Sequence, residues 1–261
     1  MLTSTASSLE RAGLDAVALK PTECDVERAA ELAIDTVAID YEGRESLPAA
    51  EVLEALASEV DIRLTTPVRA DGFDPLGDDS LLEALPETVG RVLVAGHPAY
   101  LTEDERARAV APRLGAALEG LADAWVGTES VERIAMATGA TQYDLLSRTT
   151  PRELAAIRAA GFDGDVAVYA PTVCSEDEDT ILEAVGDYVA RRQPVASALP
   201  DAAATDASAT GRAREVLLAA AEDYALVGTE RAVSDQVEVL HEAGATTVVG
   251  YPAAGLENVL E

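Results

Sequence analysis

The chain has 261 residues, with 48 acidic against 19 basic side chains and a net charge of −29. This length suits one large domain, and an α/β barrel needs about 250 residues. The acidity argues against a nucleic-acid partner, because phosphate backbones are bound through Lys and Arg. It predicts a high-salt cytoplasm, because the Debye length at about 1 M salt is about 3 Å and screens the self-repulsion. An acidic protein of an ordinary cell is the alternative.

The sequence shows no targeting, membrane or metal-binding pattern. No apolar run approaches the about 20 residues of a membrane span, and Met1–Arg11 lacks the basic start and apolar core of a signal peptide. Cys24 and Cys174 stand alone, without zinc-like spacing. We therefore expect a cytoplasmic protein with no membrane partner and no metal.

Short apolar runs recur along the chain. They are rich in Val, Ile and Leu and do not alternate cleanly with polar residues, which is typical of strands buried on both faces. The eight runs are Asp15–Lys20, Thr36–Asp40, Ile62–Val68, Arg91–Gly96, Ala124–Gly127, Tyr143–Ser147, Asp165–Tyr169 and Thr246–Tyr251.

Stretches with helical spacing of apolar residues separate these runs, for example Val26–Ala33, Val52–Val60, Ile181–Val189 and Val233–Leu240. Asp25, Thr150 with Pro151, and Thr229 are start signals, and Gly244 is a stop signal. Alternating strands and helices imply right-handed βαβ units, and eight such strands close into a (β/α)8 TIM-type barrel. An open, doubly wound sheet is the alternative.

The segment Pro194–Gly211 breaks this rhythm, because it is rich in Ala, Ser, Thr, Asp and Pro without an apolar period. We predict a single barrel domain over residues 1–261 with a flexible excursion at 194–211. The excursion is either a disordered surface loop or a lid over a ligand.

Ionisable residues end the first two predicted strands, where α/β barrels place their active sites. Lys20 is the chain's single lysine; it could form a Schiff base or bind an anion, or could simply be solvated. Asp40 and Glu42 flank Tyr41, and such carboxylates could do acid–base work or belong to a solvated loop.

Further candidates follow the fourth and fifth predicted strands. His97 comes directly after Gly96 and could serve as acid, base or anion donor, or have a structural role. Gly127–Ser130 and Gly228–Glu230 share a Gly-Thr-Glu pattern that opens a helix. Free amides at such a turn favour a phosphate, although Gly-Thr is also ordinary capping chemistry.

Six stretches together resemble a known family: Thr36–Tyr41, Thr66–Pro75, Gly90–Gly96, Gly127–Ala140, Asp165–Asp179 and Tyr224–Pro252. They are similar to strands and turns of the bacterial-luciferase-like flavin and deazaflavin oxidoreductases, most of all the archaeal methylenetetrahydromethanopterin reductases. The resemblance implies a shortened luciferase-like barrel from a haloarchaeon, and a cytoplasmic homodimer. It further implies hydride transfer between a deazaflavin coenzyme, or less readily flavin mononucleotide, and a one-carbon pterin or another small substrate.

The resemblance also implies site residues. Cofactor contacts carry over to Asp40, Thr66, Val68, Gly96, Gly127, Thr128 and Glu129, with the last three near the phosphate. Asp40, Tyr41 and His97 would be the polar groups near the reacting atoms. The protein's task would be to position the coenzyme against the substrate and exclude water.

The sequence also departs from the family, which leaves two alternatives open. Tyr41 stands where the family has histidine, and His97 with Pro98 replaces a glycine-rich turn. Only Tyr100–Ala122 lies where the family has a long insertion. The chain could therefore be a barrel that binds no cofactor and acts as a regulatory or partner-binding protein, with Tyr41, His97 and Tyr100 filling its mouth. A lyase or aldolase that uses Lys20 is the other alternative.

Overall fold

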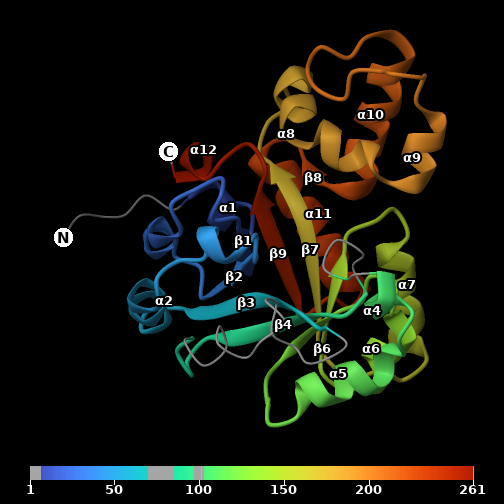
Figure 1. Ribbon diagram of the computed structural model, residues 1–261. Helices are drawn as coiled ribbons and strands as arrows, with labels where there is room; N and C mark the ends of the chain where they lie inside the picture. Colours follow the sequence, from blue (N-terminus) through green and yellow to red (C-terminus); the bar gives the residue numbers. More distant parts are fainter. Residues whose placement is uncertain (1–6, 70–84, 97–100, 102, 261) are drawn as a thin grey trace. The chain divides into compact units, whose positions relative to one another are not determined.

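The computed structural model describes residues 7–69, 85–96, 101 and 103–260 (Figure 1). Its strands are β1 (Ala16–Leu19), β2 (Thr36–Ile39), β3 (Asp61–Pro67), β4 (Gly90–Val94), β5 (Trp125–Gly127), β6 (Thr141–Leu145), β7 (Val166–Val173), β8 (Leu226–Val227) and β9 (Thr247–Pro252). Their order is β6-β5-β4-β3-β2-β1-β9-β7-β8, and β6 also pairs with β7. Eight strands thus close into a ring, with β8 attached to β7, which confirms the predicted TIM-type barrel.

Each of the eight predicted apolar runs forms a barrel strand. Strand β7 is longer than its predicted run, because the chain continues in extended form from Tyr169 to Val173 with every residue buried. The short strand β8 pairs with this extension, at Thr172 and Val173. Burial on both faces therefore marks the strands as the sequence predicted.

Helices join the strands. They are α1 (Ser8–Arg11), α2 (Ala50–Ala57), α4 (Glu103–Arg106), α5 (Val110–Leu118), α6 (Glu132–Ala137), α7 (Thr150–Ala159), α8 (Glu178–Ala190), α9 (Gln193–Ala198), α10 (Gly211–Tyr224), α11 (Glu230–Ala243) and α12 (Glu257–Leu260), with two 3-10 helices, η1 (Val26–Glu31) and η2 (Arg44–Ser46). No helix within the described ranges is long and apolar enough to cross a membrane.

The predicted helix ends are set by local hydrogen bonds. The Asp25 side chain accepts from a backbone amide at the start of η1, and the Thr229 side chain does the same for α11. Gly244 ends α11 in the left-handed region, with a φ of 119°, which glycine adopts without steric cost. Only the helix type after Asp25 differs, since residues 26–31 form a 3-10 helix.

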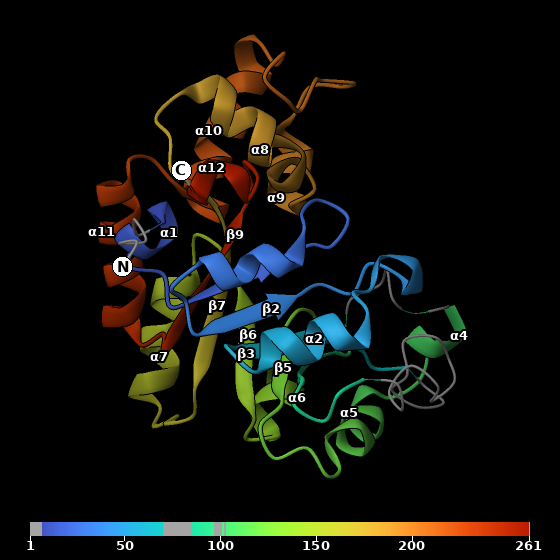
Figure 2. The same ribbon diagram turned by 90° about the vertical axis from the view of Figure 1, so that its left-hand side faces the viewer.

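The chain divides into two compact units. Unit one comprises Met1–Asp15, Leu146–Phe162 and Tyr169–Glu261, and unit two comprises Ala16–Leu145 and Asp163–Val168. Unit two holds β1 to β6, and Figure 2 shows α2 beside β3, with η1 next to it. A single domain over residues 1–261 stays a prediction.

The predicted excursion at 194–211 lies in unit one and includes all but the first residue of helix α9. Figure 1 shows α8, α9 and α10 grouped together, and Val195 and Ala209 belong to their buried core. The loop also packs closely on α8: a β-carbon at Gly186 would lie 1.9 Å from the Thr205 carbonyl oxygen. The segment therefore has packed structure, and its flexibility stays a prediction.

Candidate functional site

The two faces of the strands in unit two carry different side chains. Paired residues of parallel strands point to the same face, and Ala18, Ala38 and Arg63 are paired in this way, as are Thr65, Val92 and Trp125. On the opposite face, Leu93 and Val126 pack against α5 and α6. The first face is therefore the one that does not contact these helices. Because side chains alternate along a strand, Lys20 and Asp40, at the ends of β1 and β2, lie on this first face.

Asp40 is the most perturbed ionisable group at these strand ends. Its backbone N–H donates to the Leu19 carbonyl oxygen at 2.9 Å, which holds the carboxyl beside the end of β1. Burial raises the pKa of Asp40 to about 7, the positive charge of Lys20 opposes this, and the charges of Glu42 and Glu23 add to it. No donor in the described part of the chain hydrogen-bonds to this half-buried carboxyl.

The groups around Asp40 form a charged rim. The Lys20 Nζ lies 3.2 Å from a Glu23 carboxyl oxygen. The Glu42 carboxylate accepts hydrogen bonds from the Thr22 N–H at 2.9 Å and from its hydroxyl at 2.6 Å. Glu42 therefore stabilises the loop after β1 through these hydrogen bonds, whereas the Asp40 carboxyl is available for proton transfer. The predicted carboxylate pair thus separates into one structural and one candidate catalytic group.

Tyr41 and Thr65 link the second strand end to the third. The Thr65 hydroxyl oxygen accepts a hydrogen bond from the Tyr41 N–H at 2.6 Å. Both residues are buried, with 7% of Tyr41 and 5% of Thr65 exposed. Thr65 shares the strand face of Asp40, whereas the sequence predicted a cofactor contact for Thr66 and none for Thr65. The alternation of side chains along β3 was the signal that could have found it.

Two predicted cofactor residues lie on the opposite strand face. Thr66 pairs with Leu93, and its hydroxyl donates to the Leu64 carbonyl oxygen. Val68 is fully buried in the core under α5 and α6, and its carbonyl accepts a hydrogen bond from Arg113. The structure therefore does not bring the side chains of Thr66 and Val68 together with Asp40. Their predicted cofactor contacts have no geometric support.

The predicted phosphate turn, Gly127–Ser130, uses its polar groups within the protein. The Thr128 N–H donates to the Tyr143 carbonyl at 3.0 Å, and the Thr128 hydroxyl donates to the Asp144 carboxylate at 2.6 Å. The helix that follows, α6, has only six residues, and two carboxylates, Glu129 and Asp144, belong to this region. The described groups of this turn thus do not fit an anion.

The second Gly-Thr-Glu element, in unit one, is ordinary capping chemistry. The Thr229 hydroxyl accepts from the Ala232 N–H at 3.2 Å, and Glu230 pairs with Arg11 at 2.6 Å. Among the residues that the structure covers, no group of three or more His, Cys, Asp or Glu side chains is arranged so that it could hold a metal ion. His97, Pro98 and Tyr100 lie outside the described residues.

Gly96 and Glu129, both predicted to contact a cofactor, lie against each other. A β-carbon at Gly96 would stand 2.1 Å from the Glu129 carbonyl oxygen, whereas one at Gly127 would be 3.5 Å from its nearest neighbour. The close approach at Gly96 is therefore made by the protein's own backbone.

We expect Gly96→Ala to lower the free energy of unfolding by about 1–3 kcal/mol, since backbone must shift to admit the methyl group. Gly127→Ala is the matched control and should cost less, because its new methyl group makes only ordinary contacts. Thermal and urea unfolding measure both changes. Equal losses for the two variants would contradict the close contact at Gly96.

The fold and these residues define a (β/α)8 barrel with an ionisable carboxyl of raised pKa, Asp40, at its strand ends. The chain belongs to DUF7388, a family of unknown function whose model matches residues 9–259. No curated protein matches the sequence.

Two solved structures share the fold over most of both chains. The coenzyme F420-dependent tetrahydromethanopterin reductase from Methanopyrus kandleri is 16% identical with a TM-score of 0.59, covering 92% of this chain and 96% of that one. An F420-dependent secondary alcohol dehydrogenase, solved with an F420-acetone adduct, is 13% identical with a TM-score of 0.54, covering 95% and 94%. At these identities the likeness shows the barrel fold.

Proposed function

We propose that the protein is a luciferase-like oxidoreductase that transfers a hydride between a deazaflavin coenzyme and a small carbonyl or imine substrate, pterins included. The observation that carries the proposal is the Asp40 carboxyl, half-buried at the strand ends, with a pKa of about 7 and with no hydrogen-bond donor among the described residues. The two F420-dependent structural neighbours support the choice of coenzyme. A homodimer in a high-salt cytoplasm belongs to the same proposal.

The described residues fit only part of such a coenzyme. The Asp40 carboxyl, which has no hydrogen-bond donor in the described part of the chain, and the Thr65 hydroxyl suit the polar edge of a redox ring. The turn at 127–130 does not suit a phosphate, because its hydroxyl and amide are occupied within the protein. We therefore place the reacting end of the coenzyme near β1 to β3 and assign no phosphate site to this turn.

A hydride added to a carbonyl or imine carbon leaves the neighbouring oxygen or nitrogen in need of a proton. A reduced deazaflavin supplies the hydride when bound. With a pKa of about 7, Asp40 is protonated in a large fraction of molecules at neutral pH and can donate that proton, then regain it from water. The positive charge of Lys20 would stabilise the Asp40 carboxylate left behind.

Titration of the protein in molar potassium chloride with F420 and then with flavin mononucleotide, followed by cofactor fluorescence, tests the proposal. We expect saturable binding whose affinity changes with pH around 7. Asp40→Asn should abolish that pH dependence, and Glu54→Gln, an exposed carboxylate on α2, should keep it. Absence of binding for both cofactors would overturn the proposal in favour of a barrel with a regulatory or partner-binding role. Binding whose pH dependence survives in Asp40→Asn would remove Asp40 from the reaction.

A second candidate function is a lyase or aldolase in which Lys20 forms an imine with a carbonyl substrate. The observation that favours it is the placement of Lys20 and Asp40 on one strand face, with the lysine charge acting on the carboxyl. Borohydride reduction with a small carbonyl compound should then label Lys20 irreversibly, detected by peptide mass. Free lysine added to the reaction is the reagent control. If the free lysine is labelled and Lys20 is not, the lyase or aldolase function is excluded.

A further inference from the structure

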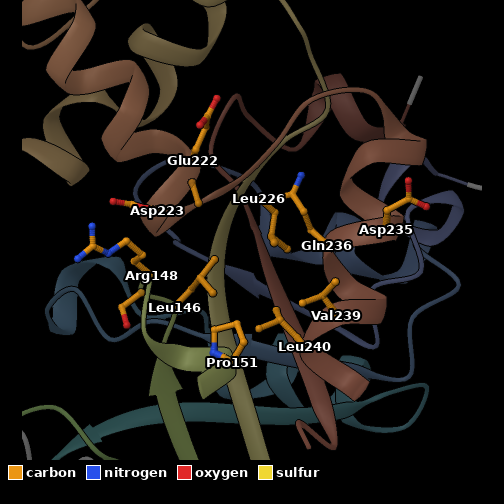
Figure 3. Close-up of a pocket in the computed structure, with 12 residues that line it drawn as sticks. Leu146, Arg148, Pro151, Glu222, Asp223, Leu226, Asp235, Gln236, Val239 and Leu240 are labelled. Atoms are coloured by element: carbon orange, nitrogen blue, oxygen red, sulfur yellow. The ribbon is translucent and has the colours of Figure 1, made fainter. Parts of the chain in front are cut away.

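A cavity of about 370 Å³ lies within unit one, lined by residues from the loop before α7, the end of α10 and α11 (Figure 3). Its floor is apolar: Leu146, Leu226 and Leu240 line it and are buried, with 7%, 2% and 2% of their surface exposed. Cavities of about 300–1,000 Å³ are the usual size of small-molecule sites. None of the residues proposed above for hydride transfer lines this cavity.

An exposed valine stands at the edge of this apolar floor. Val239 lines the cavity and is 51% exposed, and Leu121 in unit two, at 38%, is the other large apolar side chain exposed in the described part of the chain. A single exposed apolar residue needs no explanation, but one continuous with an apolar cavity enlarges a surface that a ligand can cover.

The rim of the cavity is negatively charged. Glu222, Asp223 and Asp235 line it against one cation, Arg148, which gives a net charge of −2 from three carboxylates and one guanidinium. Figure 3 shows Glu222 and Asp235 on opposite sides of Leu226. Among the described residues, none of these four charged side chains makes a hydrogen bond or an ion pair within the protein. The carboxylates are therefore available to a ligand.

We propose that this cavity binds a small organic cation with an apolar body. The apolar part would cover Leu146, Leu226 and Leu240, and a protonated amine would lie at the carboxylate rim. Anionic ligands are disfavoured by the net charge of the rim, and neutral ligands lack the attraction to it. This site is separate from the proposed oxidoreductase site, so either can fail without the other.

Three probes of six carbon atoms each, hexylamine, hexanol and hexanoate, test which ligand charge the cavity prefers. Binding to the full chain in potassium chloride is followed by calorimetry and by NMR shifts. We expect hexylamine to bind best and hexanoate worst, with the gap between them narrowing as salt rises. Equal binding of the three probes, or best binding of hexanoate, would overturn the proposal.

Two pairs of variants locate the site. Val239→Trp should fill the cavity and weaken hexylamine binding by about tenfold or more, whereas Leu121→Trp, at the other exposed apolar position, should leave it unchanged. Asp235→Asn should weaken binding about two- to fivefold, whereas Glu238→Gln, exposed on the same helix but outside the cavity, should not.

Substitution of Arg148, the cation on the rim, tests the sign of the ligand's charge most directly. Arg148→Gln should tighten hexylamine binding, because it removes the one positive charge among the described residues that line the cavity. Weaker amine binding in Arg148→Gln would point to a carboxylate-bearing ligand instead and overturn the proposal. The proposal would also be overturned if no probe bound the protein and Val239→Trp abolished its self-association. The cavity would then belong to an interface between protein chains.

Discussion

Asp40→Asn should stabilise the protein at pH 8 and have little effect at pH 4. The folded-state pKa of Asp40, about 7, lies above its ordinary value of 3.8. Below pH 3.8 the carboxyl is neutral in both states, so the folded state bears no penalty. As pH rises toward 7, the unfolded chain ionises first and the folded state loses relative stability, and above 7 this loss is complete. Asparagine never ionises and avoids the loss.

The free energy of unfolding of Asp40→Asn at pH 8 should exceed that of the wild type by about 2–4 kcal/mol. This gain is below the upper limit, which is the rise in the pKa of Asp40 multiplied by about 1.36 kcal/mol per pKa unit. Urea unfolding of both proteins from pH 4 to 8, in constant molar potassium chloride, measures it. Glu54→Gln on α2 controls for the loss of one negative charge and should show a difference that does not vary with pH in this way. A constant difference between wild type and Asp40→Asn across this range would show that burial does not raise the pKa of Asp40.

Arg63→Met should lower the free energy of unfolding by about 2–4 kcal/mol. Arg63 is 6% exposed, and its guanidinium donates to the Asp123 carbonyl at 2.8 Å and to the Asp123 carboxylate at 2.7 Å. It also pairs with Asp61 at 2.8 Å and lies 4.6 Å from the centre of the Trp125 ring. Methionine retains the apolar stem but loses the hydrogen bonds, the ion pairs and the ring contact.

The matched variant Asp123→Asn removes one partner of the same ion pair. The Asp123 side chain is 79% exposed, so its charge is well solvated and its loss should cost at most about 1 kcal/mol. Urea unfolding compares the two variants, and the fluorescence of Trp125, the single tryptophan, reports the loss of the guanidinium from its ring. Equal losses in both variants would mean that the exposed ion pair, rather than the buried contacts of Arg63, stabilises this end of β3.

The barrel could be predicted because its strands and helix ends have local causes. A parallel strand buried on both faces must be apolar along its length, and this pattern marked all eight barrel strands. Asp25 and Thr229 cap their helices through their own side chains. The packing of residues 194–211 was missed because alanine carries too little apolar contrast, although Ala203 and Ala209 pack in that core.

The candidate site was predictable in part. Lys20 and Asp40 were found because strand ends in a barrel face the site, but the sequence did not show that the Asp40 carboxyl would have no hydrogen-bond donor among the described residues. Thr66 was selected and Thr65 was not, because strand faces alternate and an error of one residue exchanges them. The contact of Gly96 with Glu129 joins distant segments, which no local pattern predicts.

Unit one joins the two ends of the chain. Ser8 donates to the Val259 carbonyl across 251 residues, and the Asp15 carboxylate accepts from the Val248 N–H across 233. During synthesis, Val248 and Val259, the partners of the N-terminal segment, are added after all of unit two. The N-terminal segment must therefore wait unpaired while nearly all of unit two, which is almost continuous in sequence, can already assemble. Closure of unit one by these contacts therefore follows the synthesis of unit two.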